Sequence, residues 1–115
     1  METIRQGKTT VAPEVILDII RQAALYTEGV LGMASIPPRV DRIFRRLITG
    51  EGIALEILDD SVTIDLYLIA DQVDLLNLGH RVQREVIRSV DKLVGLKVSE
   101  VNIHIEDVAY PGNSA

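Results

Sequence analysis

Residues 53–70 read IALEILDDSVTIDLYLIA, with apolar and polar side chains alternating on both sides of an acidic turn at 59–61. Alternation with a period of two is typical of β-strands that bury one face. The turn lacks the Asn-Gly or Asp-Gly pair that most strongly indicates a hairpin, so the alternation carries the prediction. The stretch predicts a β-hairpin whose inward side chains are Ile53, Leu55, Ile57, Val62, Ile64, Leu66 and Leu68.

An amphipathic helix is predicted before this hairpin. Over 14–28, apolar residues recur at helical spacing and charged residues take the opposite side. Pro13 suits the first turn of a helix, where its missing N–H would have no partner in any case. Gly29 can supply the left-handed residue that commonly ends a helix. The apolar residues of this helix are Val15, Ile16, Ile19, Ile20, Ala23 and Ala24.

A second helix is predicted after the hairpin, from a cap at Asp71 to a stop at Gly95. Asp74 stands where the acid of a capping box sits. Lys92 in the last turn, with the glycine beyond it, is typical of a helix end. The apolar stripe that we expect to face the sheet consists of Leu75, Leu78, Val82, Val86, Ile87, Val90, Leu93 and Val94.

Three further strands complete the predicted sheet, over 7–12, 30–35 and 96–108. In the last of these, Val98 is out of phase with the alternation farther along the strand. An extra residue in one strand of a pair produces such a change of phase. The pattern therefore predicts a β-bulge near Ser99.

Each helix and each well-defined strand has one apolar side, so both helices should cover the same face of one sheet. We therefore predict an α+β fold in the form of a two-layer sandwich. It has a mixed β-sheet of about five strands, two main helices packed on one face, and a short basic helix or loop at 39–48. The whole chain, 1–115, is predicted to be one domain, with frayed ends at 1–6 and 110–115.

The composition narrows the class of protein. The chain has 115 residues and no cysteine, so disulfides, thiolate catalysis and cysteine-ligated metals are excluded. Aromatic residues make up 3%, and the net charge of −5 gives a pI near 4.9, two features that argue against nucleic-acid binding. No signal-peptide stretch opens the chain, and no apolar run reaches the roughly 18 residues of a membrane span. We therefore expect a cytoplasmic protein.

No set of residues has the spacing of a familiar catalytic or metal site. The triplet GKT at 7–9 looks like the end of a phosphate-binding loop, but Glu2 stands where that motif requires glycine. His80 and His104 lack a second ligand at metal-site spacing. Paired acids on a strand face suit glycoside hydrolysis only inside a cleft, for which a small two-layer domain has little material. We expect no enzyme activity, no cofactor, no metal and no small-molecule substrate.

The sheet face away from the helices is predicted to be polar. Solvation by water is the plainer interpretation of such a face, and the same side chains also suit contact with a partner. The candidates for such an interaction are Asp65, Tyr67, Asn102 and His104.

The segment 39–48 combines an apolar stripe at helical spacing with four arginines, and we call residues 39–46 of it the arginine segment. Peripheral membrane segments and partner-docking helices share this pattern, and a solvated surface is equally compatible with it. The candidate contacts to a partner or to lipid are Arg39, Arg42, Phe44, Arg45 and Arg46.

Three more arginines, at 81, 84 and 88, follow one side of the second predicted helix. Acids within reach on the same helix include Glu85 and Asp91. Pairs three or four residues apart on a helix surface attract each other weakly. We therefore favour surface ion pairs for these arginines over a binding site.

Several pieces of the chain together resemble the alkaline shock protein family of bacterial envelope stress response proteins. They follow one another in the family's order and span nearly the whole domain. The pieces are GKTTVAPEV at 7–15, TEGVLGM at 27–33, VTIDLYLI at 62–69, VQREVIRSVDKLVGLKV at 82–98 and SEVNIHI at 99–105. The chain departs from the family at 35–52, where it reads SIPPRVDRIFRRLITGEG.

The resemblance implies a non-enzymatic cytoplasmic protein of cell-envelope stress response and homeostasis. It also implies self-association into a homo-oligomer and recruitment to the inner face of the cell membrane through a protein partner, such as an integral-membrane anchor. It provides no catalytic residues to carry over. The alternative is direct peripheral binding of anionic lipid, or of nucleic acid, through the arginine segment.

Overall fold

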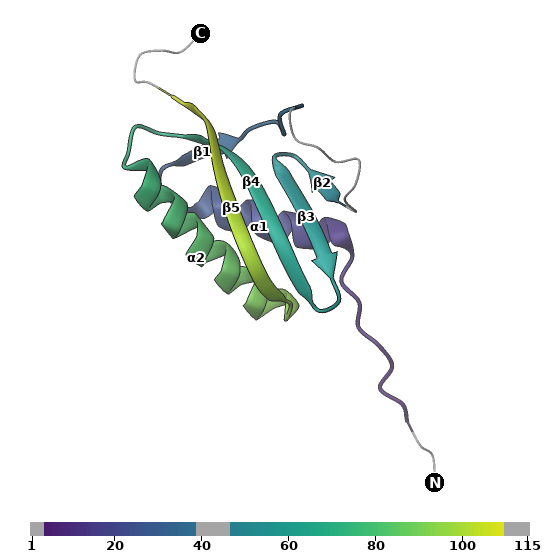
Figure 1. The fold of residues 1–115 in the computed structure, drawn as a ribbon. Helices are drawn as coiled ribbons and strands as arrows, with labels where there is room; N and C mark the ends of the chain where they lie inside the picture. Colours follow the sequence, from purple (N-terminus) through teal and green to yellow (C-terminus); the bar gives the residue numbers. More distant parts are fainter. Residues whose placement is uncertain (1–3, 39–46, 110–115) are drawn as a thin grey trace.

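A five-stranded sheet with both helices behind it forms the body of the molecule (Figure 1). The computed structural model describes residues 4–38 and 47–109. The predicted class, a two-layer α+β fold with a mixed sheet, is confirmed. In chain order the elements are α1 (Pro13–Tyr26), β1 (Val30–Met33), β2 (Ile48–Gly50), β3 (Ile53–Leu58), β4 (Ser61–Ala70), α2 (Leu75–Val94) and β5 (Lys97–Val108).

Strand β4 is the centre of the sheet. On one edge it pairs antiparallel with β3, from Leu66 opposite Ile53 down to Ser61, and beyond that with β1, from Leu68 to Ala70. On the other edge it pairs parallel with β5 along its whole length. Strand β2 extends the sheet beyond β3. The predicted hairpin is therefore confirmed, and the parallel pair follows from the helical crossover between β4 and β5.

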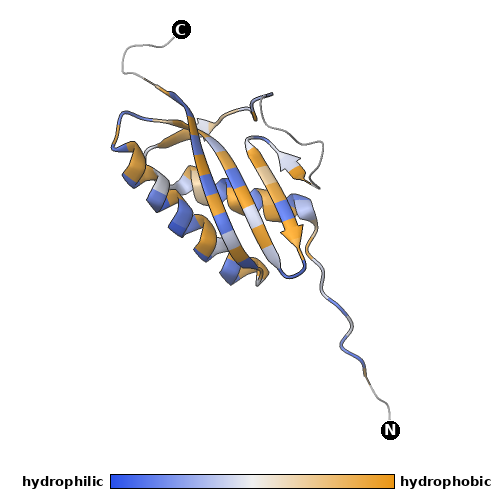
Figure 2. Ribbon diagram, viewed as in Figure 1, coloured by the Kyte–Doolittle hydropathy of each residue, from blue (hydrophilic) through white to orange (hydrophobic). Residues whose placement is uncertain are grey.

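The core lies between the sheet and the helices, as the alternation predicts. Strand β4 alternates between apolar and polar residues along most of its length, whereas β3 is apolar except at Glu56 (Figure 2). Burying one Leu or Val side chain contributes about 1.5 to 3 kcal/mol. The largest side chains that are exposed by 1% or less are Ile20, Ile53, Leu55, Val62, Ile64, Leu66, Leu68, Leu78, Val82, Val86 and Val90.

The predicted first strand is wrong. Residues 7–12 form no strand, and every residue from 4 to 15 is exposed. The strand prediction rested on local β-propensity, which reflects fit to a half-buried surface and not an intrinsic backbone preference. A segment that buries nothing gains little from extended pairing. This part of the chain therefore leaves the body of the molecule as a coil before α1 (Figure 1).

The sheet still has five strands, because the short strand β2 is present where no strand is predicted. Strand β2 pairs Ile48 with Leu55 and Gly50 with Ile53. The short basic helix or loop predicted over 39–48 is therefore wrong at Ile48, whose side chain packs against the core from a strand. Tertiary pairing with β3 overrides the local helical periodicity there. Residues 39–46 lie outside the described residues.

Helix α1 begins at Pro13, as predicted, and ends at Tyr26, two residues before the predicted end. Thr27 closes it in an extended conformation, and its N–H donates to the carbonyl of Ala24. Gly29 does adopt a positive φ of 104°, but it lies three residues past the helix and leads into β1. The left-handed residue therefore serves the turn between helix and strand.

Helix α2 begins later than predicted. Its N-cap is Asp74, whose Oδ1 accepts a hydrogen bond from the N–H of Asn77 at 3.1 Å. Asp71, the predicted cap, accepts only from the neighbouring N–H of Gln72, at 2.8 Å. The predicted stop is confirmed, because Gly95 is left-handed with φ of 77° and its N–H donates to carbonyls of the last turn.

The apolar stripe of α2 is narrower than predicted. Leu78, Val82, Val86 and Val90, spaced by four, are fully buried. Three predicted members lie at its margins and are exposed by 37 to 61%. They are Leu75, Ile87 and Leu93.

The cap assignment predicts a difference between two similar substitutions. Asp74→Ala should lower the free energy of unfolding by about 1 kcal/mol, because it removes the acceptor for one orphan N–H of α2. Asp71→Ala is the matched control and should cost clearly less, since Asp71 caps no helix. Urea denaturation followed by circular dichroism measures both. An equal loss in the two variants would contradict the assignment.

Candidate interaction surface on the open sheet face

The candidate surface lies on the face of the sheet that looks away from the helices. Inward residues of β4 fill the core, so Asp65 and Tyr67, which alternate with them, point the other way. In the parallel pair, Asp65 is opposite Asn102 and Tyr67 is opposite His104. The four predicted interaction residues are therefore neighbours on two adjacent strands. We call this group the open-face cluster.

A bulge in β5 puts its two members of the cluster on the open face. The register shifts between Val98, opposite Val62, and Glu100, opposite Thr63, so that Ser99 is the extra residue. The predicted bulge is confirmed. It allows Val98 and the residues after the shift to keep apolar side chains toward the helices while Asn102 stays on the polar face.

Asp65 and His104 are joined by a direct contact across the strands. His104 Nε2 lies 2.9 Å from Asp65 Oδ1. The Asp65 side chain is 18% exposed and that of His104 is 38% exposed. The distance fits an Nε2–H that donates to the carboxylate, and protonation of the ring would turn the contact into an ion pair. The carboxylate therefore orients the imidazole on the surface.

Tyr67 forms the floor of the cluster. Its ring stacks on that of His104, with the centroids 4.6 Å apart and an angle of 15° between the planes. Tyr67 is only 3% exposed, although it lies on the face of the sheet opposite α1 and α2. Beside it, Asn102 Nδ2 donates to Glu100 Oε2 at 3.3 Å. These contacts hold the polar groups of the surface in defined positions.

The sequence predicts which residues share this face but not how they touch. Asp65 and His104 are 39 residues apart, and their contact depends on the parallel register between β4 and β5 and on the bulge. The bulge is visible in the sequence as a change of phase. The register is set by the packing of α2, and no local pattern reports it.

The chemistry open to this cluster is recognition by hydrogen bonding and ring contact. It offers a carboxylate, an amide and an imidazole, with the ring of Tyr67 beneath the imidazole. Over residues 4–38 and 47–109, no three His, Asp or Glu side chains are grouped so as to hold a metal ion.

The outer edge of β5 borders the open-face cluster. Among the described strands β5 pairs only with β4, so alternate backbone groups on its other edge have no strand partner. The side chain of Gln83 donates to the carbonyl of Val101 at 3.0 Å. Next to this edge, α2 and β5 enclose a shallow groove of about 300 Å³. It is lined by Leu75, Leu76, Gly79, His80, Gln83, Ile103 and Ile105.

The predicted contacts of the arginine segment lie outside the described residues. These are Arg39, Arg42, Phe44, Arg45 and Arg46.

Of the surface pairs predicted on α2, one is present and loose. Arg88 Nη1 lies 3.9 Å from Glu85 Oε2. Arg81 contacts no acid and instead donates to Asn77 Oδ1 and to the carbonyl of Glu28. Within the described residues, Arg84 and Asp91 have no ion-pair partner.

Neither α1 nor α2 combines the length and the apolar character that crossing a lipid bilayer would require.

Comparisons with known proteins agree with the sequence resemblance. Residues 1–110 match the model of the alkaline shock protein 23 family, which is described as having a cell envelope-related function. The chain is 30% identical to the uncharacterized protein YqhY of Bacillus subtilis over 111 residues, which cover 95% of this chain and 82% of that protein. It is 29% identical to the uncharacterized protein YloU of the same organism, with 90% of each chain covered.

A solved structure shares the fold. The copper form of the MamM CTD superimposes with a TM-score of 0.52 over 90% of this chain and 92% of that one, at 14% identity. So low an identity speaks for the fold alone. The resemblance to the alkaline shock protein family is confirmed by the family match and the two Bacillus relatives. The chain belongs to the alkaline shock protein 23 family, whose function is related to the cell envelope.

Proposed function

We propose that this protein is a non-enzymatic, cytoplasmic interaction module of the bacterial cell envelope stress response. It self-associates and is recruited to the membrane by a protein partner. The observation that supports the proposal is the open-face cluster, a set of polar and aromatic side chains held in place on the face of the sheet opposite α1 and α2. The family's relation to the cell envelope supports the setting.

The contacts within the cluster make it suited to being covered by another protein. A buried charge without a partner is costly, whereas a charge that already has one can lose its water at a smaller cost. Asp65 and His104 satisfy each other at 2.9 Å, and Asn102 is held by Glu100. A partner or a second copy could therefore cover Asp65 and His104 without leaving either of them unpaired.

The same geometry argues against a catalytic use of the Asp65–His104 pair. Acid–base catalysis works best in a recess that excludes water, where electrostatic interactions are strong. The His104 side chain lies on a sheet surface and is 38% exposed. A role in orienting the imidazole for binding accounts for the contact.

A pair of matched charge variants tests the surface. Glu100→Arg/Asn102→Arg on the open face should weaken self-association at least about tenfold, since unpaired charge at a contact costs several kcal/mol. Asp91→Arg/Gln22→Arg makes the same change in net charge on the helix layer and should leave association unchanged. Sedimentation velocity over a range of concentrations measures the self-association of each variant. Equal weakening by both variants, or a native chain that stays monomeric, contradicts the proposed surface.

Recruitment is tested by capture from the native cell with its membranes included. An integral-membrane protein should be enriched with the native chain and with the helix-layer variant, and lost with the open-face variant. Flotation with protein-free anionic vesicles tests the alternative. If the native chain floats and Arg42→Glu/Arg45→Glu/Arg46→Glu does not, direct lipid contact replaces recruitment by a partner.

A further inference from the structure

The layer opposite the open-face cluster carries a basic hollow. Helix α2 and the end of α1 enclose about 550 Å³ there, which is within the size range of small-ligand sites. Three arginines and one glutamate line it, an excess of two positive charges on a chain whose net charge is −5. The lining residues are Tyr26, Thr27, Arg81, Arg84, Glu85 and Arg88.

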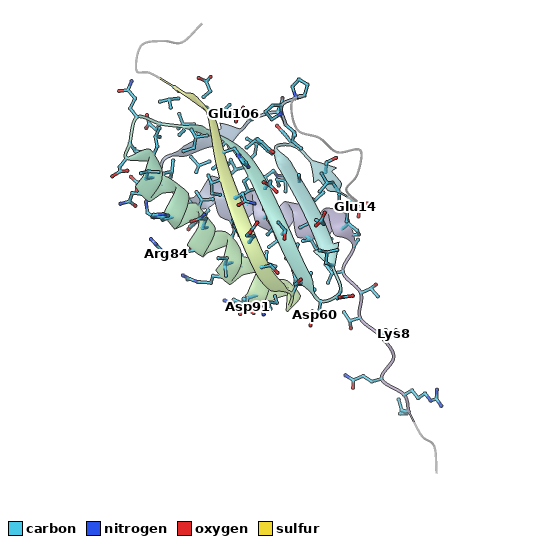
Figure 3. The ribbon with its side chains drawn as sticks, in the orientation of Figure 1. Lys8, Glu14, Asp60, Arg84, Asp91 and Glu106 are labelled. Carbon is cyan, nitrogen blue, oxygen red and sulfur yellow. The ribbon has the colours of Figure 1, made fainter. Side chains whose placement is uncertain are left out.

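The arginines converge because of helix geometry. Residues three, four and seven apart lie on one side of a helix, so Arg81, Arg84 and Arg88 follow each other along α2. Figure 3 labels Arg84 beside α2, on the helix layer behind the sheet. Like charges at these spacings repel and destabilise a helix. Their repulsion is relieved if an anion sits among them.

The first of the three arginines is fixed in position. Arg81 Nη1 donates to the carbonyl of Glu28 at 2.7 Å, and its Nε donates to Asn77 Oδ1 at 3.1 Å. At Gly29 a Cβ would lie 3.1 Å from a methyl of Leu78, so the glycine permits the close approach of α2 to this turn. The hydrogen bond to Glu28 links α2 to the turn after α1, and it fixes one wall of the hollow.

The other two arginines are left largely uncompensated. Arg84 is exposed and has no ion pair within the part of the chain that the structure describes. Arg88 meets only Glu85, at 3.9 Å, the outer limit of an ion pair. Thr27 adds no donor, because its hydroxyl already donates to the carbonyl of Ala23 at 3.0 Å. The guanidinium groups of Arg84 and Arg88 are therefore the groups free to bind a ligand.

We propose that this hollow is a binding site for a phosphate group. The guanidinium fork matches phosphate oxygens and binds them with charge-assisted hydrogen bonds. A phosphate monoester carries a charge of about −1.5 to −2 at neutral pH, which the local excess of two positive charges balances better than it would a single carboxylate. The site lies apart from the open-face cluster and goes beyond the proposed function.

The phosphate can belong to a free anion or to a lipid headgroup. The surface next to the hollow distinguishes these two sources. Tyr26 and Glu85 also line a second groove, of about 360 Å³, between α1 and α2. Its walls include Val15, Ile19 and Leu93, of which Leu93 is 61% exposed. A lipid bound by its headgroup would place apolar atoms there, whereas a free phosphate would not use this groove.

The first test uses pyrophosphate as the probe at low ionic strength. Chemical-shift changes in the ¹⁵N-labelled chain should gather at Tyr26, Thr27 and residues 81–88. Arg84→Gln/Arg88→Gln should weaken binding at least about tenfold, the expected size for lost charged hydrogen bonds. Lys92→Gln/Lys97→Gln removes the same charge from exposed positions outside the hollow and should change binding less than about twofold.

The second test uses vesicles of phosphatidic acid, whose headgroup is a phosphate monoester, in phosphatidylcholine, with phosphatidylcholine alone as the blank. If the source is lipid, Arg84→Gln/Arg88→Gln and Leu93→Gln should each bind these vesicles less than the native chain and the lysine variant do. If the source is a free phosphate, only pyrophosphate binding depends on the arginines. Circular dichroism checks that every variant folds. The site is overturned if neither probe shows arginine-dependent binding, if the lysine variant loses as much, or if the shifts fall elsewhere.

Discussion

Leu66→Ala is expected to lower the free energy of unfolding by about 3 kcal/mol. Leu66 lies in the middle of β4, opposite Ile53 on β3 and Ile103 on β5, and is fully buried. Truncation removes apolar contacts and leaves a cavity that three paired strands cannot easily close. A chain of this length has a total stability of about 6 to 17 kcal/mol, so the loss is a large share of it. Urea denaturation followed by circular dichroism measures the change.

Leu76→Ala is the matched control for this prediction. Leu76 is 80% exposed on α2, so the same truncation there should change stability by less than about 0.5 kcal/mol. A comparable loss in both variants would mean that the core does not lie between the sheet and the helices. The comparison therefore tests the layer arrangement on which the separation of the two functional faces depends.

The sequence predicts the central part of the fold well, because burying one side of a strand or helix requires apolar residues at regular spacing. In β3 and β4 every inward position is apolar, and the side chains of Ile64 and Leu68 are fully buried as the alternation requires. The spacing of four from Leu78 to Val90 identifies the buried side of α2 in the same way. A pattern of this kind is present wherever one side of an element packs and the other meets water.

The errors arise where burial is slight or where pairing is short. Residues 7–12 have strand-like composition but bury nothing, and so they form no strand. Strand β2 has three residues, too few to show a period, and it exists because Ile48 finds a partner in Leu55. At Asp71 and Asp74 two acids can both cap a helix, and only the local backbone decides that Asp74 does.

The candidate surface could be predicted as a set of residues but not as a geometry. Successive side chains of a strand point to opposite faces of the sheet, so the sequence places Asp65, Tyr67 and His104 on one face. The contact of 2.9 Å and the stacked rings need the register of β5 on β4, which is set by the crossover through α2. The basic hollow was missed for a similar reason. Helical spacing aligns Arg84 and Arg88, but only the packing of α1 beside α2 forms the hollow.

Gly52→Ala is the second substitution with a large expected effect, a loss of about 3 kcal/mol. Gly52 has φ of 68°, which disfavours a Cβ. A Cβ there would lie 2.6 Å from the carbonyl oxygen of Ala34 and 3.0 Å from that of Tyr67, both backbone atoms that cannot simply rotate away. The variant therefore combines backbone strain with displacement of the end of β1 from β4.

Gly95→Ala separates the two parts of this effect. Gly95 has a similar φ of 77°, but a Cβ there would meet no described atom within 4 Å. Gly95→Ala therefore introduces the backbone strain without the clash and should cost about 1 kcal/mol.

The clash at Gly52 should also affect the open face of the sheet. Tyr67 donates its N–H to Gly52 at 2.9 Å and accepts from Ala34 at 2.8 Å, so displacement of either strand moves the ring stacked on His104. Ring-current shifts of the His104 protons should therefore change in Gly52→Ala and stay as in the native chain in Gly95→Ala. Equal losses of stability, with unchanged His104 signals in both, would show that β1 and β3 do not meet at Gly52.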